Sequence, residues 1–203
     1  MQIQKDNIRE KILDIAREEF MQCGYQKFSL RSVSSKAGIS TSNIYNYFKG
    51  KNEIFLEILN PTLSVIEFVL NHIEESDYFR HHSYFSYQVN NELLTNLIEF
   101  VDINRSSLDL ILFKSTGSTL ENYKNDMVDR YARITLNQIK EEAKKQENIN
   151  AEVSEFFVFT ICSFYLNLID GIIKSNQTKD QMKLYAEEML DFFFNGWKAV
   201  LKF

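Results

Sequence analysis

The chain has 203 residues with 28 acidic and 23 basic side chains, so its formal net charge at pH 7 is −5. Hydrophobic residues make up 44% and charged residues 25%, which excludes a disordered chain and fits one or two folded domains. The two cysteines, Cys23 and Cys162, lie far apart without a paired spacing. This fits reduced thiols in a cytoplasmic protein better than a disulfide framework.

The charges are unevenly distributed along the chain. Residues 1–60 carry nine Lys/Arg against seven Asp/Glu, whereas residues 61–203 carry fourteen against twenty-one. No Asp or Glu occurs between Phe20 and Asn52, although five basic residues do: Lys27, Arg31, Lys36, Lys49 and Lys51. A polyanion such as nucleic acid is the natural partner for a basic end on an acidic protein.

In almost every segment the apolar residues recur at helical spacing, and in none do apolar and polar residues alternate as in a strand. The sequence therefore predicts an all-α fold. The first helix is expected from about Asn7 to Gln22 and should end before Gly24. Two short helices, Ser29–Lys36 and Thr41–Phe48, are expected on either side of the turn Ala37-Gly38-Ile39. Ser29 is placed to cap the first of them, and Ser40 or Thr41 the second.

The remaining two thirds of the chain predict longer helices. A fourth helix starts near Lys51, and Pro61 should kink or interrupt it. Two capping boxes, Ser118…Glu121 and Thr178…Gln181, mark later helix starts. The later helices are expected at Ser83–Asp102, Ser106–Ser115, Ser118–Lys145, Glu152–Ser175 and Thr178–Val200.

The second short helix has one apolar and one polar face. Ile44 and Phe48 are expected to point inward. The opposite face carries hydroxyl and amide groups, on Thr41, Ser42, Asn43, Tyr45, Asn46 and Tyr47. Such groups suit base edges and phosphate oxygens. The plain alternative is a helical hairpin with a solvated face, which the lack of acidic residues disfavours.

Residues 8–57 resemble the N-terminal domain of the tetracycline-repressor (TetR) family of bacterial transcriptional regulators. The residues that carry the resemblance are Ile12, Ala16, Phe20, Gly24, Tyr25, Ser29, Arg31, Val33, Ala37-Gly38-Ile39-Ser40, Ile44-Tyr45, Tyr47-Phe48, Lys51 and Phe55. The resemblance implies a helix-turn-helix DNA-binding domain in residues 1–51 and a helical ligand-binding and dimerisation domain in residues 52–203. It also implies a homodimer on a pseudo-palindromic operator, usually a repressor that a small molecule releases.

The family's DNA contacts can be carried over by position. Ser29 and Arg31 are expected to meet phosphate or a groove edge. The residues expected to face bases are Thr41, Ser42, Asn43 and Asn46, and those expected to hold phosphates are Tyr45, Tyr47 and Lys51. Ser42, Asn46 and Tyr47 depart from the residues common in the family, which changes the operator that is read.

Two C-terminal helices are apolar on two faces and therefore need two partners. One partner can be the protein's own body and the other a second copy, in a two-fold four-helix bundle. The alternative is the fully buried core of a monomer. The residues expected at the dimer interface are Phe157, Phe164, Ile172, Phe193, Phe194 and Trp197.

Aromatic residues concentrate after residue 60, which holds thirteen of the seventeen Phe and seven of the ten Tyr. They could line a cavity for an apolar or aromatic ligand, although core filling accounts for at least half of them. The pocket candidates are Tyr87, Phe113, Tyr123, Met127, Tyr131, Tyr165 and Asn167. The alternative is a TetR-like structural or protein-interaction factor without an inducer, which a closed body would favour.

No metal, cofactor or catalytic site is expected. His72, His81 and His82 lack further ligands at metal-binding spacing. No nucleophile elbow, phosphate-binding glycine loop or dinucleotide fingerprint occurs, so an enzyme is not expected. The most apolar run, residues 156–173, contains Asn167 and Asp170 and is expected to be a buried or interfacial helix rather than a membrane span. The operator, the inducer and the sign of regulation do not follow from the sequence.

Overall fold

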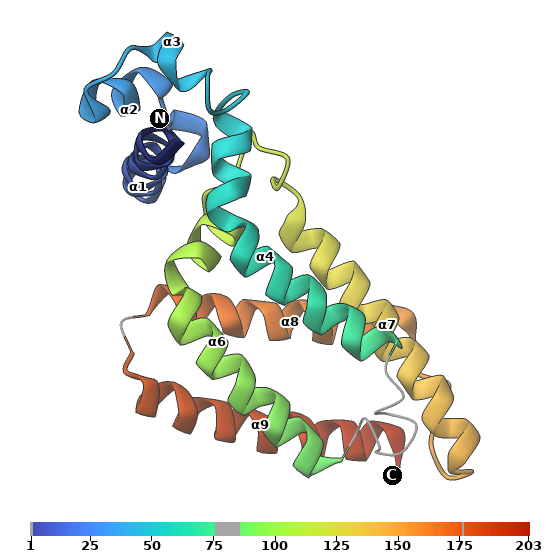
Figure 1. Cartoon of the computed structure of the whole chain (residues 1–203). Helices are drawn as coiled ribbons and strands as arrows, with labels where there is room; N and C mark the ends of the chain where they lie inside the picture. Colours follow the sequence, from blue (N-terminus) through green and yellow to red (C-terminus); the bar gives the residue numbers. More distant parts are fainter. Residues whose placement is uncertain (1, 76–85, 176) are drawn as a thin grey trace. The chain divides into compact units, whose positions relative to one another are not determined.

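The computed structural model describes residues 2–75, 86–175 and 177–203, and the regular elements within these ranges are all α-helices (Figure 1). The all-α fold predicted from the sequence is therefore confirmed. In chain order the helices are α1 (Gln2–Lys27), α2 (Leu30–Ala37), α3 (Thr41–Ile44), α4 (Lys51–Glu75), α6 (Tyr87–Phe113), α7 (Tyr123–Lys145), α8 (Glu155–Lys174) and α9 (Lys179–Leu201).

The chain forms two compact units. Unit 1 comprises Met1–Ile66 and Ser106–Lys124, and unit 2 comprises Glu67–Arg105 and Asn125–Phe203. Packing thus adds the first part of α4 and the connection between α6 and α7 to the three N-terminal helices. A functional boundary after residue 51 stays a prediction.

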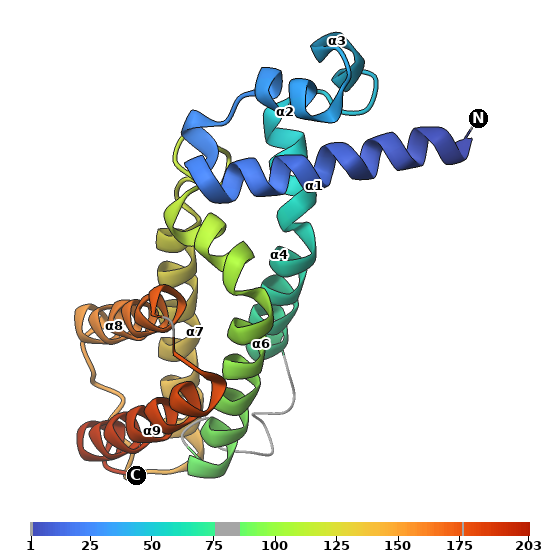
Figure 2. The ribbon, with the colours of Figure 1, turned by 90° about the vertical axis from the view of Figure 1, so that its left-hand side faces the viewer.

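Unit 1 has an aromatic core around α1. Figure 2 shows α2 and α3 on the same side of this helix. Phe20 is fully buried and stacks on Phe28, with ring centroids 3.8 Å apart, and Phe55 of α4 packs against it at 4.8 Å. Gly24 interrupts α1 with φ 70° and ψ 174°, a left-handed φ that glycine tolerates. The backbone N–H of Tyr25 then donates to the Lys114 carbonyl oxygen at 2.8 Å, which ties the end of α1 to the segment before α7.

Several helix boundaries differ from the sequence expectation. Helix α4 runs through Pro61 without ending. Helix α6 is continuous across residues 103–105, where a break was expected, because that stretch contains no Gly or Pro and Asn104 bonds back to the Phe100 carbonyl oxygen at 2.9 Å. The expected start of that helix at Ser83 lies outside the described residues.

The two predicted capping boxes have different outcomes. The Thr178 box forms, because Thr178 N–H donates to Gln181 Oε1 at 2.9 Å and Gln181 N–H to Thr178 Oγ1 at 3.3 Å. The Ser118 box does not form, and α7 starts at Tyr123 instead. The Glu121 carboxylate accepts from the Gly117 N–H, and Ser118 Oγ accepts from the N–H two residues later.

In unit 2, α8 and α9 lie antiparallel (Figure 1). Rings early in α8 therefore meet rings late in α9. Phe157 packs edge-on to Trp197 at 5.9 Å, and Tyr165 lies 4.0 Å from Phe193. Phe193 and Trp197 of α9 are buried in this contact, and Phe157 and Tyr165 of α8 are half-buried.

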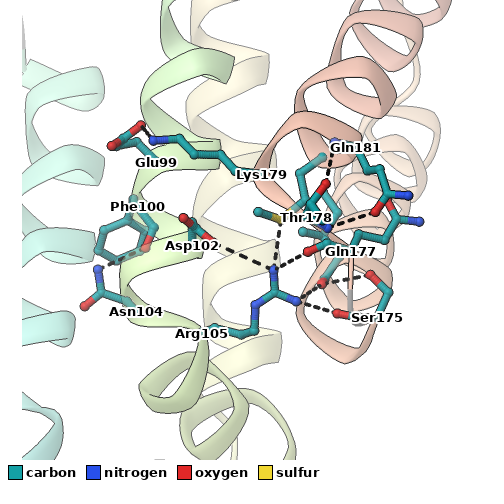
Figure 3. A network of polar contacts seen from close by, with 12 residues as sticks. Glu99, Phe100, Asp102, Asn104, Arg105, Ser175, Gln177, Thr178, Lys179 and Gln181 are labelled. Atoms are coloured by element: carbon teal, nitrogen blue, oxygen red, sulfur yellow. Dashed lines mark hydrogen bonds and ion pairs between the residues drawn. The ribbon is translucent and has the colours of Figure 1, made fainter.

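Arg105 of α6 joins the end of α8 to the start of α9 (Figure 3). Its guanidinium donates to the carbonyl oxygens of Ile172 at 3.1 Å and of Ser175. It also donates to Gln177 O at 3.3 Å and lies 3.1 Å from Met182 Sδ. The last carbonyls of a helix lack intrahelical donors, so this cation satisfies groups at the C-terminus of α8.

Candidate functional site

The turn between α2 and α3 depends on Gly38. This residue ends α2 with φ 71° and ψ 30°, and no atom lies within 4 Å of where a Cβ would stand. The backbone strain of a left-handed residue, rather than space, therefore selects glycine here. Ser29 occupies the position before α2 with extended φ and ψ, but its side chain makes no cap bond, contrary to the expectation.

Ser40 caps α3, because its Oγ accepts from the Asn43 N–H at 3.2 Å. Ile44 and Phe48 are buried as expected. The α-helix ends at Ile44 rather than at Phe48, so the expected length of the second short helix is wrong. A turn with bonds between residues three apart follows, from Asn46 N–H to Asn43 O at 3.1 Å and from Tyr47 N–H to Ile44 O at 2.9 Å.

The polar side of this segment is accessible. Tyr45, with 57% of its surface exposed, Ser42 and Asn46 are exposed, while Thr41, Asn43 and Tyr47 are half-buried. Several of these groups already bond to one another or to α2, and the bonded pairs are Ser34–Thr41 at 2.9 Å, Ser40–Ser42 at 2.9 Å and Asn46–Asn43 at 3.0 Å. The segment therefore presents a fixed set of hydroxyl and amide groups.

The predicted basic surface is partly neutralised from α1. Glu19 Oε1 lies 2.5 Å from Lys36 Nζ and accepts from Ser32 Oγ at 3.0 Å. The hydrogen bond from Lys36 lowers the pKa of the Glu19 carboxyl and raises that of the Lys36 ammonium. Arg31 and Lys49 remain exposed. Sequence spacing could not reveal Glu19, because its partners lie 13 and 17 positions away.

Lys51 is held within unit 1. Its Nζ donates to the Gln26 carbonyl oxygen at 3.3 Å and lies 4.1 Å from the Tyr25 ring centroid. Partial burial lowers the pKa of this ammonium. The residue assigned to phosphate by resemblance therefore also fixes the end of α1 against the start of α4.

The expected pocket residues are only partly brought together. Tyr131 and Tyr165 line a cavity of about 40 Å³ in unit 2. Its full lining is Asn90, Tyr131, Thr135, Tyr165, Leu190, Phe193, Phe194, Trp197 and Phe203. Tyr87 lies beside this lining, with its ring 5.2 Å from that of Phe194 and its hydroxyl donating to Asp191 at 2.8 Å. This hydrogen bond raises the pKa of Tyr87.

The other pocket candidates lie elsewhere. Phe113 and Tyr123 belong to unit 1, where the Lys124 ammonium lies 5.7 Å from the Phe113 ring centroid. Met127 is half-buried on α7, and Asn167 is exposed on α8. Four residues of α9 line the cavity, and no pattern in the sequence indicated this helix as one of its walls.

The expected dimer residues divide by burial. Ile172, Phe193 and Trp197 are buried inside unit 2, Phe157 and Phe194 are half-buried, and Phe164 is exposed. The large apolar residues that α8 and α9 do expose are Phe156, Phe159, Phe164, Leu184 and Phe192. The helical spacing of apolar residues could not separate the buried from the exposed ones, because both helices are apolar on most of their circumference.

Neither a metal site nor a membrane function gains support. Within residues 2–75, 86–175 and 177–203 no three His, Cys, Asp or Glu side chains gather as metal ligands, and His81 and His82 lie outside these ranges. Helix α8 has the length and composition of a membrane span, with a mean hydropathy of 1.8. A core helix of a soluble protein meets the same criteria, so this is weak evidence.

Comparison with known proteins finds similarity in the N-terminal part of the chain. The model of bacterial regulatory proteins of the TetR family matches residues 12–58. The HTH-type transcriptional regulator QacR of Staphylococcus aureus is 39% identical over 54 residues. This stretch covers 27% of the chain and 29% of QacR, so the match spans less than a third of that relative.

Solved structures agree with the fold over most of the chain. A TetR-family regulator from Streptomyces coelicolor matches with a TM-score of 0.62 and 18% identity, over 91% of this chain and 90% of that one. NalD of Pseudomonas aeruginosa, the secondary repressor of the MexAB-OprM efflux pump, matches with a TM-score of 0.56 and 16% identity, over 92% and 95%. At such low sequence identity, these matches show only that the fold is shared. Residues 12–58 are therefore similar to the N-terminal part of TetR-family regulators, and the chain shares the all-helical fold of solved members of that family.

Proposed function

We propose that the chain binds a specific pseudo-palindromic DNA operator as a homodimeric, cytoplasmic repressor. The observation that carries the proposal is the exposed polar side of residues 41–47, with no Asp or Glu between Phe20 and Asn52. Ile44 and Phe48 anchor the opposite side in the core of unit 1. Hydroxyl and amide groups held in this way suit base edges and phosphates in a major groove.

The test is selection of bound duplexes from a random pool at physiological salt, followed by fluorescence anisotropy. We expect a preferred duplex to bind at least about 10³-fold more tightly than random DNA. Ser42→Glu should abolish this binding because it places a carboxylate on the polar side of α3. Ser64→Glu, an equal change at an exposed position of α4, should leave it intact. The absence of any preferred duplex overturns the proposal.

The homodimer is supported by the aromatic residues that α8 and α9 leave exposed, chiefly Phe156 and Phe192. Exposed apolar side chains grouped on two neighbouring helices are typical of an interface between copies. A two-fold pair of copies presents two reading segments to two half-sites, which explains why we expect a pseudo-palindromic operator.

We further propose that a small ligand releases the protein from DNA. The cavity in unit 2 supports this part of the proposal. Six aromatic residues and no charged residue line this cavity, so it suits an uncharged aromatic or apolar molecule. At about 40 Å³ it is far smaller than the roughly 300–1,000 Å³ of small-molecule sites, so it must widen to hold one. A ligand that binds only the widened form shifts the protein toward that form.

Thermal shift with a panel of uncharged aromatic compounds tests this part separately. A true inducer should raise the Tm of the free protein and release it from the selected duplex. If DNA binding is intact and no compound does both, the second candidate is favoured: a regulator without a small-molecule inducer. The small size of the cavity is the observation in its favour.

A further inference from the structure

The turn after α3 brings the side-chain amides of Asn43 and Asn46 together. The Asn46 backbone N–H donates to Asn43 O at 3.1 Å, a bond between residues three apart. In such a 3₁₀-type turn the side chains of residues i and i+3 lie above one another. Asn46 Nδ2 then donates to Asn43 Oδ1 at 3.0 Å. The two amides therefore form one fixed pair.

Asn43 is the anchored member of this pair. Its backbone N–H donates to Ser40 Oγ at 3.2 Å, and its side chain is half-buried. Ser40 Oγ in turn lies 2.9 Å from Ser42 Oγ. The cap of α3 thus places Asn43, and Asn43 places the amide of Asn46.

Asn46 keeps the atoms that can read a base. A side-chain amide has two N–H donors and one carbonyl acceptor. One N–H is used on Asn43, and no other bond of this amide is found among the residues that the structure describes. The exposed side chain therefore still offers Oδ1 and one N–H.

This remaining pair of atoms matches adenine. In the major groove adenine presents the N6 amino donor beside the N7 acceptor, whereas guanine presents two acceptors and cytosine only a donor. We propose that Asn46 reads an adenine in the operator and that Asn43 is a positioning residue that orients its amide. The proposal rests on the proposed DNA-binding function and names the base that this function recognises.

The first experiment compares duplexes selected by the parent protein and by Asn46→Ala. We expect the variant to lose its preference for adenine at one position in each half-site, with discrimination there falling roughly 5- to 150-fold. Asn60→Ala is the matched control, because it removes the same amide from an exposed position of unit 1. It should select the same bases as the parent.

The second experiment changes the DNA rather than the protein. Replacing the identified adenine by 7-deazaadenine removes the N7 acceptor and should weaken binding by the parent. The same replacement should not weaken binding by Asn46→Ala further, since the two changes remove one contact. The comparison of the two duplexes with the parent protein does not depend on how well a variant folds.

The positioning role of Asn43 is tested by base preference, which the loss of a merely structural residue would not change. Asn43→Ala should reduce the preference for adenine at the same position. Asn43→Asp, which retains an acceptor for Asn46 Nδ2, should restore the preference while weakening binding to all duplexes by its charge. An unchanged base preference in Asn43→Ala overturns the positioning role.

The two proposals fail in different ways. If the parent selects a duplex but Asn46→Ala selects the same base at every position, the adenine contact is overturned while DNA binding stands. If the parent prefers no duplex, the proposed function is overturned, and the adenine contact with it.

Discussion

At the scale of single residues, Glu19 reduces the positive charge that α2 exposes, and α2 lies beside the proposed DNA-binding segment. Its carboxylate pairs with Lys36 at 2.5 Å. Glu19→Gln should release Lys36 and steepen the salt dependence of DNA binding by about 0.9 in the log–log slope. Glu18→Gln removes the same charge from an exposed neighbouring position and is the control. Equal slopes for the two variants in anisotropy titrations would show that Lys36 does not reach a phosphate.

The same pair predicts how stability depends on pH. The pKa of Glu19 is lowered in the folded state, so its stabilising effect is complete above the ordinary value of 4.5 and is lost as pH falls through the lower folded value. The pKa of Lys36 is raised, so its effect is complete below 10.5 and is lost as pH rises through the higher folded value. The difference in urea midpoint between the parent and Glu19→Gln should therefore be constant near neutral pH and vanish in acid. A difference that persists in acid would contradict the pairing.

Lys51 is predicted to act on both binding and stability. Lys51→Ala should flatten the salt slope by about one unit if the ammonium contacts a phosphate. It should also lower the free energy of unfolding by about 1 kcal/mol, because the ammonium lies 4.1 Å from the Tyr25 ring. Lys49→Ala, at an exposed position, should change the salt slope alone. Urea unfolding and salt titration of the two variants distinguish the roles, and equal urea midpoints would argue against the ring contact.

At the scale of helices, local signals predicted which elements exist but not where all of them end. The Ser40 cap and the left-handed Gly38 follow from residue type. The boxes at Ser118 and Thr178 have the same pattern, yet only the second forms. Gly117, with φ 83°, turns the chain so that its backbone N–H donates to the Glu121 carboxylate. Such competition depends on the backbone before the motif, which the pattern does not encode.

The candidate site divides in the same way. Its polar side was predictable because residues 41–47 carry both the buried anchors and the exposed groups. The pairing of Glu19 with Lys36, and the bond from Lys114 Nζ to Met21 O at 2.8 Å, join residues far apart in sequence. The spacing of residues along a helix does not predict contacts between distant segments, so only the folded structure shows them.

Arg105 is predicted to hold α8 and α9 in their antiparallel arrangement. Arg105→Ala leaves the carbonyls of Ile172 and Ser175 without this donor and should lower the free energy of unfolding by about 1.5–3 kcal/mol. Arg105→Lys keeps the charge but not the planar fork, so its stability should be intermediate. Arg133→Ala, at an exposed position of α7, should have little effect. Fluorescence of Trp197, the only tryptophan, reports the unfolding, and a lysine variant as unstable as the alanine variant would show that charge alone contributes nothing.

At the scale of the whole molecule, the acidic residues 61–203 carry nearly all of the exposed large apolar side chains, and the basic N-terminal part exposes the polar segment of residues 41–47. Phe156 on α8 is 80% exposed and Ile103 on α6 is 74% exposed. Neither residue is needed inside its own unit, so each can be replaced by Asp with little cost to folding. Comparing substitutions at the two positions therefore distinguishes an interface between copies from ordinary surface.

We expect the parent protein to sediment as a dimer at micromolar concentration and Phe156→Asp to weaken dimerisation at least about tenfold, which corresponds to roughly 1.4 kcal/mol. A buried carboxylate in the interface would lack a partner, whereas Ile103→Asp should leave the dimer unchanged. Since the proposed dimer contacts two half-sites, Phe156→Asp should also lose affinity for a full operator but not for an isolated half-site. A parent that sediments as a strict monomer, or an Ile103→Asp variant that dissociates equally, would contradict an interface on α8 and α9.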